Sequence, residues 1–127
     1  MKIDHIAIWT VDLELSKEFY VKWFGAIPNN RYENITKQFT SYFLKFENNS
    51  CRIELMHKPG LSKLENENIL GLSHFAISVG TKELVDKITN EMSKSGIIIY
   101  SQPRNTGDGY YESVVLDPDG NKIEITL

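Results

Sequence analysis

The sequence repeats a short pattern after about 70 residues, and this repeat limits what the chain can fold into. Residues 4–8 read Asp-His-Ile-Ala-Ile, and residues 73–77 read Ser-His-Phe-Ala-Ile. About fifty residues later each string is followed by a basic-apolar-Glu-apolar string, at 52–55 and at 122–125. His5 and His74 are 69 residues apart, and Glu54 and Glu124 are 70 apart. The pattern indicates one module written twice.

The first half of the chain shows the signals of a strand, a helix and a hairpin. We expect a strand at 3–9, then a helix at 13–24 with Asp12 as its N-cap and Gly25 as its stop. A polar stretch at 31–37 is predicted as a loop, and aromatic and β-branched residues predict strands at 39–46 and 51–56.

The second half repeats these signals. We expect a strand at 73–79, a helix between Thr81 and Gly96, a short strand at 97–100, a loop at 102–109, and strands at 110–116 and 122–126. The sequence thus predicts an α+β fold in one domain, 1–127, built from two βαβββ modules, 1–57 and 72–127, with a linker at 58–71.

Alternation along the strands places the repeated polar residues on one face. His5, Glu54, His74 and Glu124 all have the parity opposite to that of their aliphatic neighbours. The predicted helices each carry one apolar stripe, formed by Leu15, Phe19 and Trp23 in the first and by Leu84, Val85, Ile88 and Met92 in the second. Because these stripes must be buried, the helices are expected to cover the aliphatic faces. The other faces would then form a curved cleft.

The four repeated residues form a candidate metal site. Two imidazole nitrogens and two carboxylates suit a borderline divalent ion such as Ni²⁺, Co²⁺, Zn²⁺ or Fe²⁺. A single strand histidine is more often a hydrogen-bonded structural residue, and a single strand glutamate is usually solvated. No packing requirement explains both types twice at one separation, so the sequence favours metal binding.

Composition excludes several classes of partner. The net charge of -3 gives no reason to expect nucleic acid or an anionic membrane. No apolar run approaches the roughly 18 residues of a membrane span, so we expect a cytoplasmic protein. Cys51 is the only cysteine in the sequence, which leaves no intramolecular disulfide and no thiolate cluster within one chain.

The motifs resemble those of the vicinal oxygen chelate superfamily. They include His5, Phe19-Tyr20 before Phe24-Gly25, the Glu54 strand, residues 71–74 (Gly-Leu-Ser-His) and residues 117–124 (Asp-Pro-Asp-Gly-Asn-Lys-Ile-Glu). This superfamily includes glyoxalase I, bleomycin-resistance proteins, fosfomycin-resistance transferases and extradiol dioxygenases. The resemblance implies paired modules that curl into a half-barrel around a metal ion. The ligand order His5, Glu54, His74, Glu124 is most similar to that of bacterial glyoxalase I.

The resemblance also implies a reaction type. A lyase or isomerase of this kind would act through a metal-bound enediolate on a small α-oxygenated substrate, with Glu124 as the base and Glu54 as its counterpart. Trp9 stands where glyoxalase I usually carries an arginine, and Lys58 stands near its usual asparagine, both of which contact glutathione. Glutathione or another thiol as co-substrate therefore stays open. A homodimer is expected from the resemblance and from the frequency of symmetric dimers.

Further residues are candidates for binding the substrate. Trp9, Met56 and Tyr111 could line an apolar pocket or belong to the core, and Arg52 and Lys122 could steer an anion or lie at the rim. Two other functions stay open at this point. One is a non-catalytic protein that binds an antibiotic or a small aromatic molecule, and the other is an Fe(II) extradiol-type dioxygenase.

Overall fold

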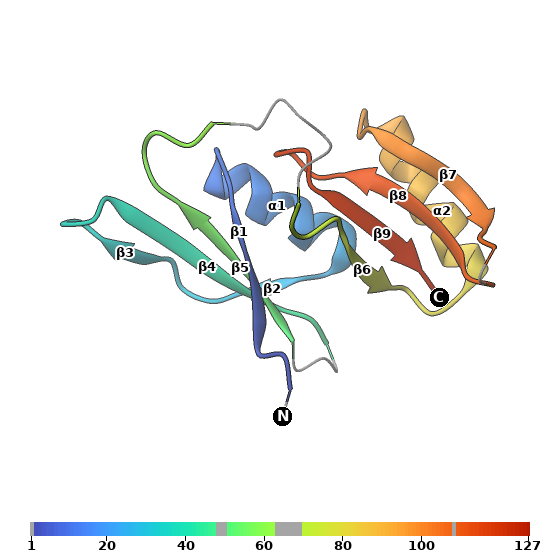
Figure 1. The fold of residues 1–127 in the computed structure, drawn as a ribbon, viewed down its shortest axis with the longest axis horizontal. Helices are drawn as coiled ribbons and strands as arrows, with labels where there is room; N and C mark the ends of the chain where they lie inside the picture. Colours follow the sequence, from blue (N-terminus) through green and yellow to red (C-terminus); the bar gives the residue numbers. More distant parts are fainter. Residues whose placement is uncertain (1, 48–50, 63–69, 108) are drawn as a thin grey trace. The chain divides into compact units, whose positions relative to one another are not determined.

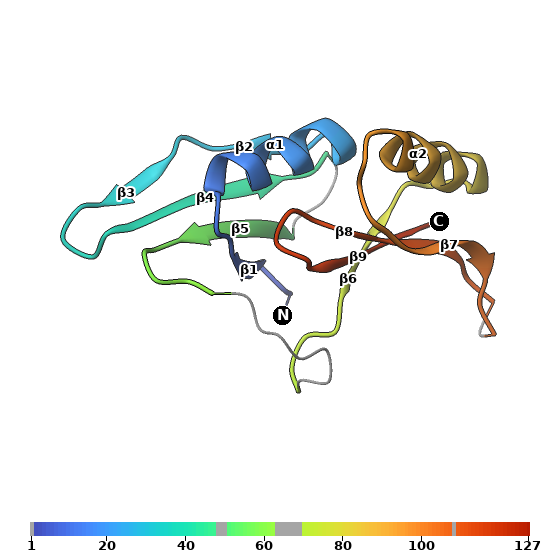
Figure 2. The same cartoon turned by 90° about the horizontal axis from the view of Figure 1, so that it is seen from above.

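The computed structural model describes residues 2–47, 51–62, 70–107 and 109–127. The chain divides into two compact units, residues 1–65 and 66–127. In each unit a helix packs on one face of a sheet (Figures 1 and 2). Part of the predicted linker 58–71, namely 63–69, lies outside the described residues, so the linker stays a prediction.

The first unit contains β1 (His5–Trp9), α1 (Leu13–Phe24), β2 (Ile27–Pro28), β3 (Tyr32–Asn34), β4 (Phe39–Lys45) and β5 (Arg52–His57). Its strand order is β1-β5-β4-β2, and β3 also pairs with β4. Strands β1 and β5 run parallel, whereas β4 is antiparallel to β2, β3 and β5. The two short strands β2 and β3 together occupy the place of a single strand in the βαβββ pattern.

The second unit contains β6 (Phe75–Ser78), α2 (Lys82–Lys94), β7 (Ile99–Asn105), β8 (Tyr111–Leu116) and β9 (Lys122–Thr126). Its strand order is β6-β9-β8-β7, with β6 parallel to β9. The first strand of each unit therefore lies parallel to the last, and the middle strands are antiparallel. The predicted α+β fold is confirmed.

The helices begin and end where the sequence predicts. The Asp12 carboxylate accepts a hydrogen bond from the Leu15 N–H (3.0 Å), and the Thr81 hydroxyl accepts one from the Leu84 N–H (3.2 Å). Gly25, with φ of 63°, adopts the left-handed conformation that ends α1. Capping chemistry is local, which is why the sequence shows it.

The buried stripe of α1 differs from the predicted one. The buried residues are Leu13, Ser16, Phe19 and Tyr20, whereas Leu15 is 52% exposed. Ser16 is fully buried, and a polar residue at that position does not show as part of an apolar stripe. In α2 the buried residues are Val85, Thr89 and Met92, and Leu84 is exposed.

A buried pair of hydroxyls joins α2 to its sheet. The Thr89 hydroxyl donates to the Val85 carbonyl (2.7 Å) and lies 2.6 Å from the Ser113 hydroxyl on β8. Buried polar groups are stable only when hydrogen-bonded, and here each satisfies the other. The face of β8 that contains Ser113 is therefore the helix-facing side of the sheet.

Two predicted loops contain strands. Residues 32–34 in the predicted loop 31–37 form β3, and β7 continues through Pro103 to Asn105 instead of ending at residue 100. Strand β7 lies at the sheet edge, where a proline without an N–H is tolerated. Its pairing with β8 shifts register between Ile99 and Ser101 and again before Arg104, so its pattern does not alternate regularly.

The turn between β8 and β9 is stabilised by a buried carboxylate. Asp117 Oδ1 accepts hydrogen bonds from the N–H groups of Asp119 (3.0 Å) and Asn121 (2.8 Å), and Oδ2 accepts from the Asn121 side chain (2.9 Å). This turn sets the register of β9, which carries Glu124.

We expect Asp117→Ala to lower the free energy of unfolding by about 1–3 kcal/mol, because the turn donors lose their acceptor. Urea denaturation monitored by circular dichroism measures the change. Asp117→Asn keeps one acceptor oxygen and should lose less. Equal stability of Asp117→Ala and the unmodified protein would contradict this role.

Candidate metal centre

The first unit brings His5 of β1 close to Glu54 of β5. Parallel pairing places Ala7 opposite Glu54, so His5 lies two residues earlier on the same face. His5 Nε2 lies 3.8 Å from Glu54 Oε2, and the Glu54 side chain is 16% exposed. Phe43 of β4 packs edge-on against the His5 ring, with centroids 5.3 Å apart. A nitrogen and a carboxylate thus face each other on the sheet surface.

A carboxylate holds the other nitrogen of His5. His5 Nδ1 donates to Asp4 Oδ2 (2.9 Å), and Asp4 also pairs with the Arg52 guanidinium. The hydrogen bonds from His5 and then from Arg52 hold the pKa of Asp4 below its usual value. With Nδ1 bonded to Asp4, Nε2 is the ring nitrogen that faces Glu54.

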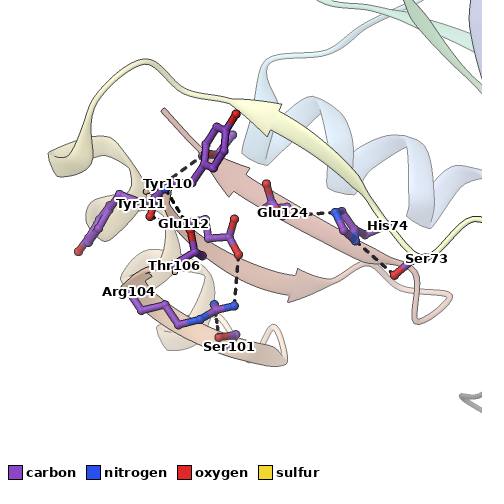
Figure 3. A network of polar contacts seen from close by, with 10 residues as sticks. Ser73, His74, Ser101, Arg104, Thr106, Tyr110, Tyr111, Glu112 and Glu124 are labelled. Carbon is purple, nitrogen blue, oxygen red and sulfur yellow. Dashed lines mark hydrogen bonds and ion pairs between the residues drawn. The ribbon is translucent and has the colours of Figure 1, made fainter. Parts of the chain in front are cut away.

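The second unit repeats the arrangement. His74 lies directly before β6, and its Nε2 is 3.3 Å from Glu124 Oε2 on β9 (Figure 3). Ala76 pairs with Glu124 as Ala7 pairs with Glu54. His74 Nδ1 lies 3.3 Å from the Ser73 hydroxyl, which stands at the position of Asp4. Both units therefore present one nitrogen and one carboxylate in the same register.

The small residue opposite each glutamate leaves room above the sheet. Ala7 and Ala76 are both exposed, although each lies within the sheet beside a partly buried glutamate. A longer side chain at either position would extend over the glutamate carboxylate. Both units therefore carry a small, exposed residue opposite the glutamate.

Glu112 and Arg104 belong to the second unit's group, and sequence reasoning missed them. Glu112 of β8 is 8% exposed and accepts a hydrogen bond from the Arg104 guanidinium (3.2 Å), which also donates to Ser101 (Figure 3). Burial, followed by repulsion from Glu112 and a hydrogen bond to it, raises the pKa of Glu124. The register of β8 with β9, in which Val114 pairs with Glu124, is needed to see this neighbour.

Trp9 and Met56 lie on the same face as His5 and Glu54. They pair directly in the β1–β5 register, two residues beyond Ala7 and Glu54. Trp9 is 43% exposed, and Lys58 Nζ lies 4.6 Å from the centroid of its ring. Both residues therefore lie beside the His5–Glu54 pair, and their contact with a substrate stays a prediction.

The other predicted substrate residues have partners of their own. Arg52 pairs with Asp4 and lies over the Phe43 ring (4.4 Å), and Lys122 lies over the Tyr100 ring (4.0 Å). The Tyr111 hydroxyl donates to Asp86 of α2 (2.6 Å), so the structure does not bring Tyr111 to the face of Glu124. Tyr111 shares the helix-facing side with Ser113.

The described part of the chain holds these donors in pairs. Within residues 2–47, 51–62, 70–107 and 109–127, no group of three or more His, Cys, Asp or Glu side chains lies close enough to hold a metal ion. Among the same residues, none of the helices has the length and apolar character of a membrane span.

Comparison with known proteins decides the family. The model of the glyoxalase/bleomycin resistance protein/dioxygenase superfamily matches residues 2–125. The chain belongs to this superfamily. The predicted membership is thereby confirmed, and the paired His and Glu residues belong to a superfamily whose name covers enzymes and resistance proteins.

Individual relatives of the chain carry the names of different activities. The chain is 27% identical to a probable lactoylglutathione lyase of Vibrio cholerae, over 98% of this chain and 88% of that protein. It is 30% identical to a trivalent organoarsenical cleaving enzyme of a Bacillus species, over 98% of this chain and 71% of that one. The fold is similar to that of glyoxalase I from Zea mays, with a TM-score of 0.80 at 24% identity. That match covers 98% of this chain and 44% of the maize protein.

We expect Glu112→Gln to lower the pKa of Glu124, because it removes the neighbouring negative charge and leaves the effect of burial in place. Carbon-13 NMR of the Glu side chains across a pH titration measures this. Glu91→Gln, on the exposed side of α2, is the control and should change nothing. An unchanged Glu124 pKa in Glu112→Gln would show that Glu112 exerts no such repulsion.

Proposed function

We propose that the protein is a metal-dependent lyase or isomerase, similar to glyoxalase I, that acts on a small α-oxygenated substrate. The observation that carries this proposal is the repeated His–Glu pair, at 3.8 Å in the first unit and 3.3 Å in the second. Membership of a superfamily that includes glyoxalases supports it. A relative named as a probable lactoylglutathione lyase supports the same reaction class.

The donor set fits a divalent ion. His5 and Glu54 would supply one nitrogen and one oxygen, and His74 and Glu124 would supply the same pair again. Such a mixed set suits Ni²⁺, Co²⁺, Zn²⁺ or Fe²⁺. When bound, the ion would act as a Lewis acid that stabilises negative charge on a substrate oxygen.

Glu124 is proposed as the general base. Its carboxylate would take a proton from a substrate carbon next to an oxygen-bearing carbon and return that proton to the neighbouring carbon. Burial and Glu112 raise the pKa of Glu124, which strengthens it as a base. Glu54 is its counterpart in the first unit, and His5 and His74 hold their positions through Nδ1 partners.

The finer parts of the proposal concern substrate and assembly. A thiol adduct, of glutathione or another thiol, is the substrate that the Vibrio cholerae relative's name suggests. We also propose a homodimer in the cytoplasm that takes a small molecule and binds neither nucleic acid nor membrane. The net charge of -3 supports the last point.

We expect the purified protein to bind one divalent ion per chain, measured by calorimetric titration with Ni²⁺ and Zn²⁺ after treatment with chelator. Removing a group that only hydrogen-bonds to a metal-ligating side chain lowers metal affinity by about 10–100-fold. Glu54→Gln and Glu124→Gln, which each remove a ligand, should therefore cost about 100-fold or more.

Two variants calibrate that titration. Asp4→Asn leaves every ligand in place but removes the carboxylate behind His5, and should cost about 10–100-fold. Glu91→Gln should bind like the unmodified protein. If no divalent ion binds, both metal-dependent functions, the lyase or isomerase and the dioxygenase, are refuted. A binding protein without turnover is then favoured.

We expect turnover of methylglyoxal in the presence of glutathione or another thiol, followed by absorbance of the thioester product. Glu124→Gln should lower kcat by about 10²–10⁴-fold, because it removes the proton-transfer group. Glu91→Gln should keep full activity. If no thiol adduct is converted although metal is bound, the lactoylglutathione-type substrate is wrong, and oxygen consumption with a catechol would then favour a dioxygenase.

A further inference from the structure

The open face of the first unit's sheet carries an aromatic cluster next to the His5–Glu54 pair. The cluster, here called the Trp9 cluster, consists of Trp9, Tyr32, Phe39 and Met56. Tyr32 pairs with Ser41, and Ser41 pairs with Met56, which pairs with Trp9, so these side chains share one face. The four residues come from β1, β3, β4 and β5.

The rings of this cluster form a corner. Phe39 meets Trp9 edge to face, with planes at 90° and centroids 6.2 Å apart. Tyr32 meets Phe39 at 59°, also 6.2 Å apart. Trp9 remains 43% exposed and Tyr32 52% exposed. An incoming planar ring could stack on one member and meet the edge of another, which is the geometry that aromatic pairs prefer.

The cluster lies within reach of the metal-type donors. Trp9 and Met56 are two residues beyond Ala7 and Glu54 along their strands. Two residues of strand span about 7 Å. A phenyl ring with one attached carbon is shorter than this distance and therefore fits within it. Between them only the methyl group of Ala7 rises from β1, so a ligand can extend from the Glu54 carboxylate to the Trp9 ring.

A cation stands at the far end of this path. Lys58 Nζ lies 4.6 Å from the Trp9 ring centroid, and Lys58 is exposed. None of the ion pairs found among the described residues involves Lys58, whereas Arg52 on the same face is paired with Asp4. The ammonium is therefore available for an anionic group of a ligand that covers the Trp9 ring.

We propose that the Trp9 cluster and Lys58 form a subsite for an aromatic ring bearing a carboxylate. The substrate class would be a molecule with an aryl carboxylate at one end and an oxygenated carbon at the other, because Lys58 and the His5–Glu54 pair lie at opposite ends of this path. This assignment deepens the proposed function and relies on it for the reaction, but binding at the subsite does not require the metal.

The chain contains a matched control for this idea. Its two tryptophans each have a lysine over the ring, Lys58 on Trp9 at 4.6 Å and Lys22 on Trp23 at 4.5 Å. Trp23 lies on α1 and not on the open face of the sheet. Nitrogen-15 NMR of the two indole N–H groups therefore reports on the subsite and on a reference in one spectrum.

The test is a titration of the chelator-treated protein with phenylglyoxylate, its neutral methyl ester and pyruvate, which has no ring. We expect phenylglyoxylate to shift the Trp9 indole resonance saturably and leave that of Trp23 in place. Trp9→Leu should weaken phenylglyoxylate binding at least tenfold by calorimetry, and its NMR spectrum shows whether it is folded. Lys58→Met should weaken phenylglyoxylate but not the ester.

Several outcomes would overturn the subsite. One is that Trp9 does not respond, and another is that pyruvate shifts it as strongly as phenylglyoxylate. A third is that Trp9→Leu abolishes a dimer without changing ligand affinity, which would make the cluster a contact between copies of the chain. Because the titration is done without metal, absence of metal binding or turnover would refute the proposed function and leave this result intact.

Discussion

Parallel pairing of the first and last strand in each unit is the constraint on which the candidate centre depends. It places Ala7 opposite Glu54 and Ala76 opposite Glu124, and so brings each histidine to its glutamate. Parallel neighbours cannot be joined by a tight turn and need a crossover of a dozen or more residues. The helix and the middle strands supply this connection, which explains why about fifty residues separate a histidine from its glutamate.

The pairing gives each unit the same His–Glu pair, but the surrounding residues make the two pairs different. Behind His5 stands the Asp4 carboxylate, itself paired with Arg52, whereas a neutral hydroxyl, that of Ser73, takes this place beside His74 Nδ1. Beside Glu124 stands Glu112, whose counterpart in the first unit is Ser41, as the pairings with Thr126 and Met56 show. In the proposed reaction the first unit would therefore hold His5 firmly in place, and the second unit would keep the Glu124 carboxylate basic.

The sequence predicts what alternation and local chemistry determine. Helix caps and the α+β class follow from local patterns in the sequence. The shared face of His5 and Glu54 follows from the alternation of polar and apolar residues within each of their strands. Sequence reasoning misses Glu112 because its proximity to Glu124 depends on the β8–β9 register. It leaves Tyr111 open between a pocket and the core because nothing near Tyr111 in the sequence indicates which side faces α2. Polar buried residues such as Ser16 and Ser113 hide the apolar face from a pattern search. That all four repeated residues bind one ion stays a prediction.

The residues that occur in both units suit ion binding, whereas the residues that occur in one unit suit substrate recognition. The histidine, the small alanine and the glutamate occur twice, as a symmetric task such as holding an ion requires. The counterpart of Trp9 in the second unit is Ser78. Trp9 is the last residue of β1 and pairs with Met56, and Ser78 is the last residue of β6 and pairs with Thr126. A substrate has two different ends, so the residues that recognise it must break the symmetry of the repeat. The aromatic ring with its lysine stands on one unit only, which is why substrate class has to be sought there and not among the residues that the two halves share.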